Sequence, residues 1–218
     1  MFADNNFRDP AYIRLLAEQY PTVEAASTAI VNMRAIMELP KGTEYYFSDL
    51  HGEHEAFIHL LRSASGTIRD KVEDCYSNIL SETERDELAS LIYYPEEVMR
   101  RNRKVCADYG EWSRIMLNRL IPVLQEVNQK YPRDRVDTLI SRKYHFIIRE
   151  LLGSSDEKGK EAYCQELIAA SVDTGIGDGL ISNLCYLIQQ IAVDNLHIIG
   201  DIFDRGPGAH RILDELMY

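Results

Sequence analysis

The sequence predicts an α/β fold that carries a large α-helical insertion. Two short apolar runs, residues 45–47 and 196–199, each end in a glycine-containing turn, as strands do before a ligand-bearing loop. Segments on both sides of each turn carry apolar residues at helical spacing. Residues 65–174 between them lack the alternation typical of strands. We therefore expect a first core segment at 1–64, a helical insertion at 65–174, and a return to the core at 175–218.

Composition places the chain among soluble globular proteins. Its 218 residues are 45% hydrophobic and 27% charged. The formal net charge of −11 disfavours nucleic acid as the main partner, because phosphate binding needs a positive surface. We expect no membrane association and a cytoplasmic location, since the sequence lacks a long apolar run and a signal-peptide pattern. The four cysteines lie far apart, so neither a disulfide framework nor a zinc knuckle is expected.

Helical and strand signals divide the first core segment. Residues 9–19 begin with an Asp-Pro pair, a typical helix start. Residues 22–37 begin with a threonine cap and carry apolar side chains at helical spacing. Residues 45–47 are aromatic and predict a short buried strand, and residues 53–63 predict the helix after it.

The insertion shows helical signals of its own. Ser81 and Glu84 stand three apart, which is the spacing of a capping box. Residues 112–127 carry apolar side chains at helical spacing, and residues 137–152 repeat this pattern. Residues 153–160 are polar and rich in glycine and serine, so they predict a loop.

The pattern of the core resumes near the end of the chain. Residues 175–179 contain three glycines and predict a turn. Residues 180–193 predict an apolar helix, and residues 196–199 predict a second buried strand. Residues 207–217 predict a final helix.

Two motifs after the predicted strands carry candidate metal ligands: Asp49-Leu50-His51 and Gly200-Asp201-Ile202-Phe203-Asp204-Arg205-Gly206. Ligands of open α/β sheets gather beyond the carboxyl ends of strands. If the first motif is extended, Asp49 and His51 point to the same side and can hold one cation. Asp201 on the neighbouring strand could bridge two cations roughly 3.5–4 Å apart. Mixed oxygen and nitrogen ligands suit manganese, iron or zinc better than calcium.

The remaining motif residues fit phosphate chemistry. Arg205 offers a planar, permanently charged fork for phosphate. Asp204 is suited to orienting a ligand or the arginine. Gly52, Gly200 and Gly206 allow close backbone approach at a crowded site. Taken alone, the first motif is more typical of a surface turn than of a pair of metal ligands. The second motif is more specific, because each residue type in it has a role.

The other histidines carry weaker signals. His54 could face the site, although a solvated position on a helix is the simpler interpretation. His197 lies in a predicted buried strand and is expected to be a hydrogen-bonded core residue. His59 is expected to be structural, and His145 is expected on a helix surface or in the core. His210 is close enough to the second motif to touch substrate.

The two motifs and their neighbours resemble those of the calcineurin-like metallophosphoesterase superfamily. The sequence of residues 46–53 and 195–207 is more specifically similar to that of class III (Firmicutes-type) fructose-1,6-bisphosphatases. The long helical stretch between the motifs supports this resemblance, which runs the whole length of the chain. It implies part of a metallophosphoesterase α/β sandwich core, with the helices inserted between the motifs.

The resemblance also implies an activity and a set of site residues. The reaction is hydrolysis of the 1-phosphate of fructose 1,6-bisphosphate to fructose 6-phosphate and phosphate, a gluconeogenic step with Mn2+ as the usual cation. Asp49 and His51 would hold one metal and Asp201 would bridge to a second. Arg205 would bind the substrate phosphate, and Asp204 would act beside it in catalysis.

The family extends well beyond the equivalent of Tyr218, with further asparagine and histidine ligands. We therefore expect the chain to be an N-terminal portion in which the two-metal site is incomplete. A parallel sheet without its later strands has an unpaired edge, so a homo-oligomer is also expected.

Two other functions remain open at this stage. Motifs of this kind set the chemistry and not the substrate, so a phosphoprotein or nucleotide phosphatase of the same superfamily is an alternative. A non-catalytic helical interaction or regulatory module with half a metal site is the other. The basic run at 100–104 is typical of a solvated helix face, with a phosphorylated effector as the alternative partner.

Overall fold

The computed structural model describes residues 9–153 and 159–217. The chain divides into two compact units, Met1–Pro40 and Lys41–Tyr218. The first unit contains α1 (Pro10–Gln19) and α2 (Val23–Met37). Asp9 accepts a hydrogen bond from the amide of Ala11, and Thr22 accepts one from the amide of Ala25, which confirms both predicted caps. Neither helix buries a side chain.

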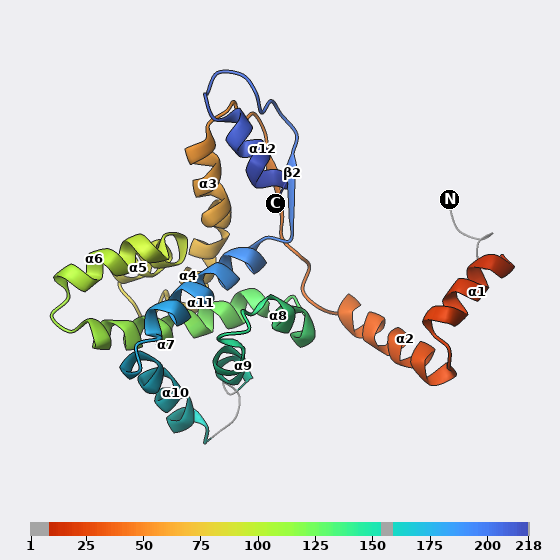
Figure 1. Ribbon diagram of the computed structural model, residues 1–218, viewed down its shortest axis with the longest axis horizontal. Helices are drawn as coiled ribbons and strands as arrows, with labels where there is room; N and C mark the ends of the chain where they lie inside the picture. The colour runs from red at the N-terminus through yellow and green to blue at the C-terminus, as the bar shows by residue number, and fades with distance from the viewer. Residues whose placement is uncertain (1–8, 154–158, 218) are drawn as a thin grey trace. The chain divides into compact units, whose positions relative to one another are not determined.

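The second unit is mostly helical and contains a small parallel sheet. In chain order it consists of β1 (Glu44–Phe47), α3 (His54–Arg62), the 3-10 turn η2 (Ala64–Gly66), α4 (Thr67–Tyr76), α5 (Glu82–Tyr93), α6 (Pro95–Val105), α7 (Tyr109–Asn128), α8 (Arg133–Leu139), α9 (His145–Gly153), α10 (Glu161–Asp173), α11 (Gly177–Ala192), β2 (Asn195–Ile198) and α12 (Ala209–Met217) (Figure 1). The predicted α/β class is confirmed at this level.

The sheet of the described residues has two parallel strands, with Tyr46 opposite His197. One face is covered by α3 and α12. Phe47 and Leu50 pack there against Phe57 of α3 and Ile212 of α12. These hydrophobic contacts hold the strand pair against the two helices that follow the motifs.

The other face of the sheet is open. Tyr46 is 59% exposed and Ile199 is 71% exposed. The prediction that both strands are buried was therefore wrong for one face, because the described helices pack on the other. Parallel sheets are normally covered on both faces, so an open face is unusual for this pairing.

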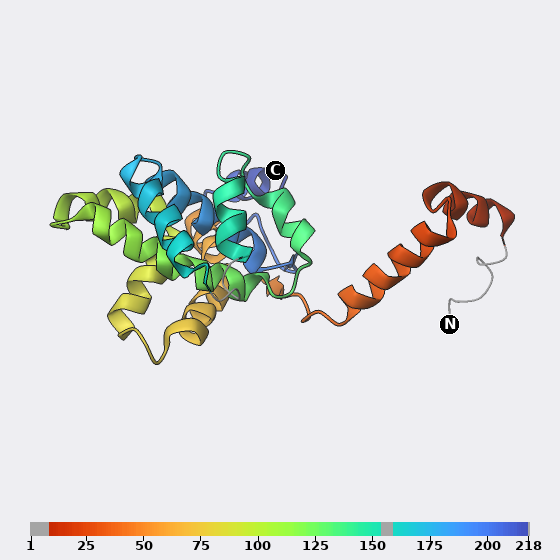
Figure 2. The ribbon, with the colours of Figure 1, turned by 90° about the horizontal axis from the view of Figure 1, so that it is seen from below.

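The main hydrophobic core lies between helices. The 20-residue helix α7 runs through it and lies alongside α11, as Figures 1 and 2 show from two directions. Leu117, Leu120 and Leu124 of α7 are fully buried beside Leu184 and Ile188 of α11. The predicted helix at 112–127 is thus confirmed as the centre of the helical region. No helix in 9–153 or 159–217 is long and apolar enough to cross a bilayer.

Local signals within residues 65–174 had mixed outcomes. The capping box is confirmed, since Ser81 and Glu84 exchange side-chain and backbone hydrogen bonds at the start of α5. The single helix expected at 137–152 is wrong, because α8 ends at Leu139 and α9 begins at His145. Ile140, between them, has an extended backbone and is buried in the core. Burial of this segment therefore outweighs its helical spacing.

Two boundaries also differ from the predicted ones. Helix α11 begins at Gly177, so part of the turn expected at 175–179 is already helical. Most of the loop expected at 153–160 lies outside the described residues.

Gly179, near the start of α11, lies close to the buried side chain of Tyr144. A Cβ added at Gly179 would lie 3.0 Å from the ring carbon Cζ of Tyr144, which explains the glycine at this position.

Candidate metal centre

The loops that follow β1 and β2 are joined through their backbones. The amide of His51 donates to the carbonyl of Asp201 at 3.0 Å, and the amide of Gly206 donates back to the carbonyl of His51 at 2.6 Å. The amide of Gly208 donates to the carbonyl of Gly52 at 2.9 Å. These bonds extend the contact between the two strands into the two motif loops.

Glycines make this approach possible. A Cβ added at Gly52 would lie 2.3 Å from the carbonyl oxygen of Gly206, and one at Gly206 would lie 2.6 Å from that of His51. A Cβ at Gly200 would lie 2.2 Å from the amide nitrogen of Asp49. Real side chains cannot occupy such positions, so the expected close backbone approach at these three glycines is confirmed.

The joined loops bring three candidate ligands together. His51, Asp201 and Asp204 each offer one ligand atom, and these atoms lie within 4.8 Å of one another. Nδ1 of His51 contacts Oδ1 of Asp204 directly. One imidazole and two carboxylates form a donor set that suits a divalent transition metal. We call these three residues the metal group.

Asp49 lies beside the metal group and is not one of its three members. Its Oδ1 accepts a hydrogen bond from the amide of Asp201 at 3.3 Å. The first motif is not extended, because Asp49 has a φ of 52° and His51 a φ of 49°. The alternation that was expected to align these two side chains is therefore absent. Metal ligation by Asp49 stays a prediction.

Backbone strain gathers in the motif loops. Five non-glycine residues among those described have positive φ, and three of them are Asp49, His51 and Arg205. This conformation is costly for residues with a Cβ and persists where the surrounding structure enforces it. Strained residues cluster at functional sites in many proteins, and the cross-loop hydrogen bonds hold these residues in place.

The side chain of Arg205 extends into solvent. It is 74% exposed, and its Nε lies 3.7 Å from Oδ2 of Asp204. Oδ1 of Asp201 accepts from the amide of Phe203 at 2.9 Å, which tightens the turn before the arginine. The guanidinium is thus available to a ligand beside the metal group.

Two histidines differ from their expected environments. His54 was expected to be solvated and is only 8% exposed, because α12 covers it and its Nε2 lies 3.8 Å from Glu215. His197 was expected in the core and is half-buried, with a side chain that is 43% exposed, because it lies on the open face of the sheet. Its ring stacks on that of Tyr46 with centroids 4.5 Å apart.

The remaining three histidines are not members of the metal group. His59 shares a 2.6 Å hydrogen bond with the hydroxyl of Tyr94, which fits its expected structural role. His145 is half-buried at the start of α9, and His210 is exposed in α12. Contact of His210 with substrate stays a prediction.

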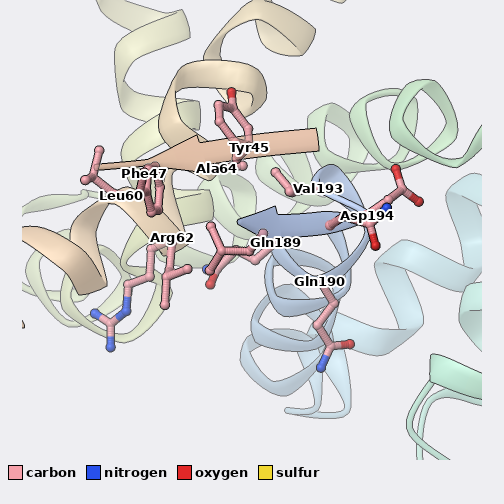
Figure 3. Close-up of a pocket in the computed structure, with 12 residues that line it drawn as sticks. Tyr45, Phe47, Leu60, Arg62, Ala64, Gln189, Gln190, Val193 and Asp194 are labelled. Atoms are coloured by element: carbon pink, nitrogen blue, oxygen red, sulfur yellow. The ribbon is translucent and has the colours of Figure 1, made fainter. Parts of the chain in front are cut away.

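A separate cavity of about 320 Å³ lies between β1, α3 and α11. Tyr45, Phe47 and Leu60 form much of its apolar lining, and Arg62 and Gln190 add polar groups, as Figure 3 shows. None of the motif residues lines it. The cavity is therefore distinct from the metal group.

Comparison with known families gives the chain an assignment. A family model described as Firmicute fructose-1,6-bisphosphatase matches residues 11–218. The chain belongs to this family. Both motif loops and the whole helical region lie within the match, so the resemblance inferred from the two motifs is confirmed.

Curated relatives named "Fructose-1,6-bisphosphatase class 3" align along almost the whole chain. The one from Parabacteroides distasonis is 46% identical over 217 residues, which are 99% of this chain and 33% of the relative. That from Phocaeicola vulgatus is 46% identical over 209 residues, or 95% and 31% of the two chains. That from Clostridium tetani is 43% identical over 210 residues, or 96% and 32%.

The chain spans about a third of the length of these curated relatives. No solved structure matches it.

Proposed function

We propose that this chain takes part in the metal-dependent hydrolysis of the 1-phosphate of fructose 1,6-bisphosphate, which yields fructose 6-phosphate and phosphate in gluconeogenesis. One observation carries this proposal. In a chain of the fructose-1,6-bisphosphatase family, hydrogen-bonded motif loops bring His51, Asp201 and Asp204 within 4.8 Å of one another. Nitrogen and carboxylate donors at the carboxyl ends of parallel strands are suited to metal-assisted phosphate chemistry.

The donor set fits Mn2+ in a two-metal arrangement. We assign His51 and Asp49 to one cation and Asp201 to the bridging position between two. When bound, such cations polarise phosphate oxygens and lower the pKa of bound water. Asp204 contacts Nδ1 of His51, which leaves Nε2 as the ring nitrogen available to a metal.

Arg205 is assigned to the substrate phosphate. Its guanidinium is exposed beside the metal group and carries five donors in a planar fork. Asp204 lies within 3.7 Å of that guanidinium and also contacts His51, so it can orient both side chains. Motif residues on the two loops would thereby hold a phosphate from two sides.

The fold around the site supports a more specific architecture. We propose that β1 and β2 belong to a metallophosphoesterase α/β sandwich, with residues 65–174 inserted between its two motifs. The parallel pairing and the motif after each strand support this assignment. We further propose that the enzyme is cytoplasmic. We also propose that it forms homo-oligomers, since the described sheet has an open face and open edges.

Phosphate release tests the proposed function. The chain is incubated with Mn2+ and fructose 1,6-bisphosphate, beside Asp201→Asn and a matched control, Asp214→Asn, at an exposed carboxylate of α12. Activity lost in Asp201→Asn and kept in Asp214→Asn is the expected result. A phosphopeptide and a dinucleotide serve as competing substrates, and faster hydrolysis of either would overturn the substrate assignment. Manganese binding without activity, abolished in Asp201→Asn, would identify a metal site that needs further residues.

A further inference from the structure

A nearly buried carboxylate joins three segments that are distant in the sequence. Oδ2 of Asp194, just before β2, accepts hydrogen bonds from Nζ of Lys130 at 2.6 Å and from the amide of Thr43 at 2.7 Å. Its Oδ1 accepts from the hydroxyl of Tyr131. Thr43 directly precedes β1, and Lys130 and Tyr131 follow α7. We call Thr43, Lys130, Tyr131 and Asp194 the Asp194 cluster.

The cluster is well satisfied and shielded from water. The side chains of Lys130 and Asp194 are 10% and 13% exposed. Nζ of Lys130 also donates to the carbonyl of Ala192 at 3.0 Å and lies 3.3 Å from the hydroxyl of Thr43. All three donors of the ammonium group are therefore used. Removing one partner of such a pair leaves the other charge buried and uncompensated, which is strongly destabilising.

The same residues begin the pairing of the strands. The carbonyl of Thr43 accepts from the amide of Asp194 at 2.8 Å and from that of Asn195 at 3.3 Å. The ladder then starts with Glu44 opposite Asn195 and ends with Phe47 opposite Ile198. A slip of one residue would turn every side chain to the other face of the sheet. Each strand has only four residues, and a sheet of two strands is marginally stable by itself, so contacts outside the ladder contribute to its pairing.

The other end of the ladder leads directly into the metal group. Phe47 is followed by the loop of Asp49 and His51, and Ile198 is followed by the loop of Asp201. Gly200 lies six positions after Asp194, a span of roughly 20 Å if the chain is extended. Because the two strands are parallel, the level at which they start determines the level at which their motif loops meet.

We propose that Asp194 is a positioning residue that sets the register of β1 and β2 at their amino-terminal ends, and thereby the geometry of the metal group at their carboxyl ends. The helical region takes part through Lys130 and Tyr131. Figure 3 shows Asp194 at the start of β2, beside the start of β1. The expectation that the metal group binds manganese rests on the proposed function. The role of Asp194 in the register of the strands does not.

The space around the carboxylate supports this role independently. A Cβ added at Gly42 would lie 2.9 Å from Cγ of Asp194. The chain is therefore drawn against the carboxylate one residue before Thr43 donates to it. Both chain segments that lead into the sheet are held by the same side chain.

The test compares Asp194 variants with a matched ion-pair variant elsewhere. Asp194→Ala removes every bond of the carboxylate and leaves the backbone bonds to the carbonyl of Thr43 possible, whereas Asp194→Asn keeps an acceptor for Thr43 and loses the charge. The control is Glu73→Gln. In the wild type, the carboxylate of Glu73 pairs with Arg69 and with Arg85, each at 2.8 Å, within the helical region. Each protein is studied at a temperature where circular dichroism shows it folded. The readouts are amide hydrogen exchange along the ladder and the manganese dissociation constant from the electron paramagnetic resonance of free Mn2+.

We expect Asp194→Ala to accelerate exchange of the ladder amides and to weaken manganese binding by roughly tenfold or more, as loss of supporting residues does at metal sites. Asp194→Asn should lie between this variant and the wild type, and Glu73→Gln should match the wild type. Equal exchange and equal manganese affinity in Asp194→Ala and Glu73→Gln would overturn the proposal. If Asp194→Ala does not fold, the comparison of Asp194→Asn with Glu73→Gln decides. If the wild type binds no manganese, the proposed function fails, while hydrogen exchange still tests the register.

Discussion

The amide of Asp201 donates to Oδ1 of Asp49 at 3.3 Å, although 152 positions separate the two residues in the chain. The contact joins the loops that follow the two strands, and it exists only when these strands pair. Two motifs that carry candidate metal ligands are thus connected before any ligand binds. Geometry at this junction depends on the backbone as much as on the ligand side chains.

Gly206→Ala should disrupt the metal group. The new Cβ would meet the backbone of His51 and Gly52 at 2.6 Å, so one loop must move away from the other. We expect a loss of about 1–3 kcal/mol in the free energy of unfolding, together with weaker manganese binding. Urea denaturation and manganese titration measure the two effects. Gly153→Ala is the control, because no atom lies within 4 Å of its added Cβ; similar losses in both variants would contradict the prediction.

Arg205→Ala should weaken substrate binding and leave metal binding intact. The guanidinium is 74% exposed and contacts no residue of the metal group other than Asp204, so its removal should not disturb the fold. Charge-assisted hydrogen bonds contribute about 1.5–3 kcal/mol, which corresponds to a rise in KM of roughly tenfold to a hundredfold. Steady-state kinetics with fructose 1,6-bisphosphate measure this rise.

A matched change elsewhere separates this effect from a general loss of positive charge. Arg211→Ala removes another exposed arginine, which pairs with Glu55 on the surface at 3.2 Å. It should leave KM unchanged. A fall in manganese affinity in Arg205→Ala would show that the arginine supports the metal group instead of the substrate.

Acid should reduce the stability that Asp194 provides. Burial raises the pKa of this carboxyl, but hydrogen bonds from Lys130, Tyr131 and the amide of Thr43 outweigh burial and lower the pKa below its usual value of 3.8. The stabilisation is therefore complete above that value and is lost as the pH falls through the lower folded pKa.

Calorimetry across pH measures this effect. The difference in Tm between the wild type and Asp194→Asn should be constant near neutral pH and should shrink below pH of about 4. Glu73→Gln removes a paired carboxylate in the helical region. The difference in Tm between the wild type and this variant is the reference for acid destabilisation that does not involve Asp194. A difference in Tm that grows in acid would contradict the prediction.

The open face of the sheet should promote self-association. Tyr46 and Ile199 are 59% and 71% exposed on the same face, next to unpaired strand edges in the described sheet. Tyr46→Lys and Ile199→Lys should shift sedimentation toward the monomer. Ile79→Lys changes an equally exposed apolar residue of the helical region, which is 73% exposed, and should have no effect. A monomeric wild type would refute this expectation.

Local chemistry made much of the secondary structure predictable. The caps at Asp9, Thr22 and Ser81 are all present, because a helix start depends on neighbouring side chains and amides. The helix at 112–127 also follows from apolar spacing alone. Residue types in the two motifs likewise indicated metal and phosphate chemistry, since few side chains offer such ligands.

Long-range contacts account for what local patterns missed. Ile140 is drawn into the core and breaks the helix expected at 137–152. His54 is buried because α12 folds over it, and His197 is only half-buried because its face of the sheet is open. Spacing within one segment carries no information about which other segment will cover it.

The candidate metal centre shows the same division. Motif composition identified His51, Asp201 and Asp204 as site residues, whereas their meeting within 4.8 Å depends on a strand pairing across the whole helical region. The sequence analysis assigned no role to Asp194, because its contacts with Lys130 and Tyr131 form only on folding. Side-chain chemistry is a local property and can be read along the chain. Register and burial are set by free energies summed over distant segments, so they emerge only when those segments pack together.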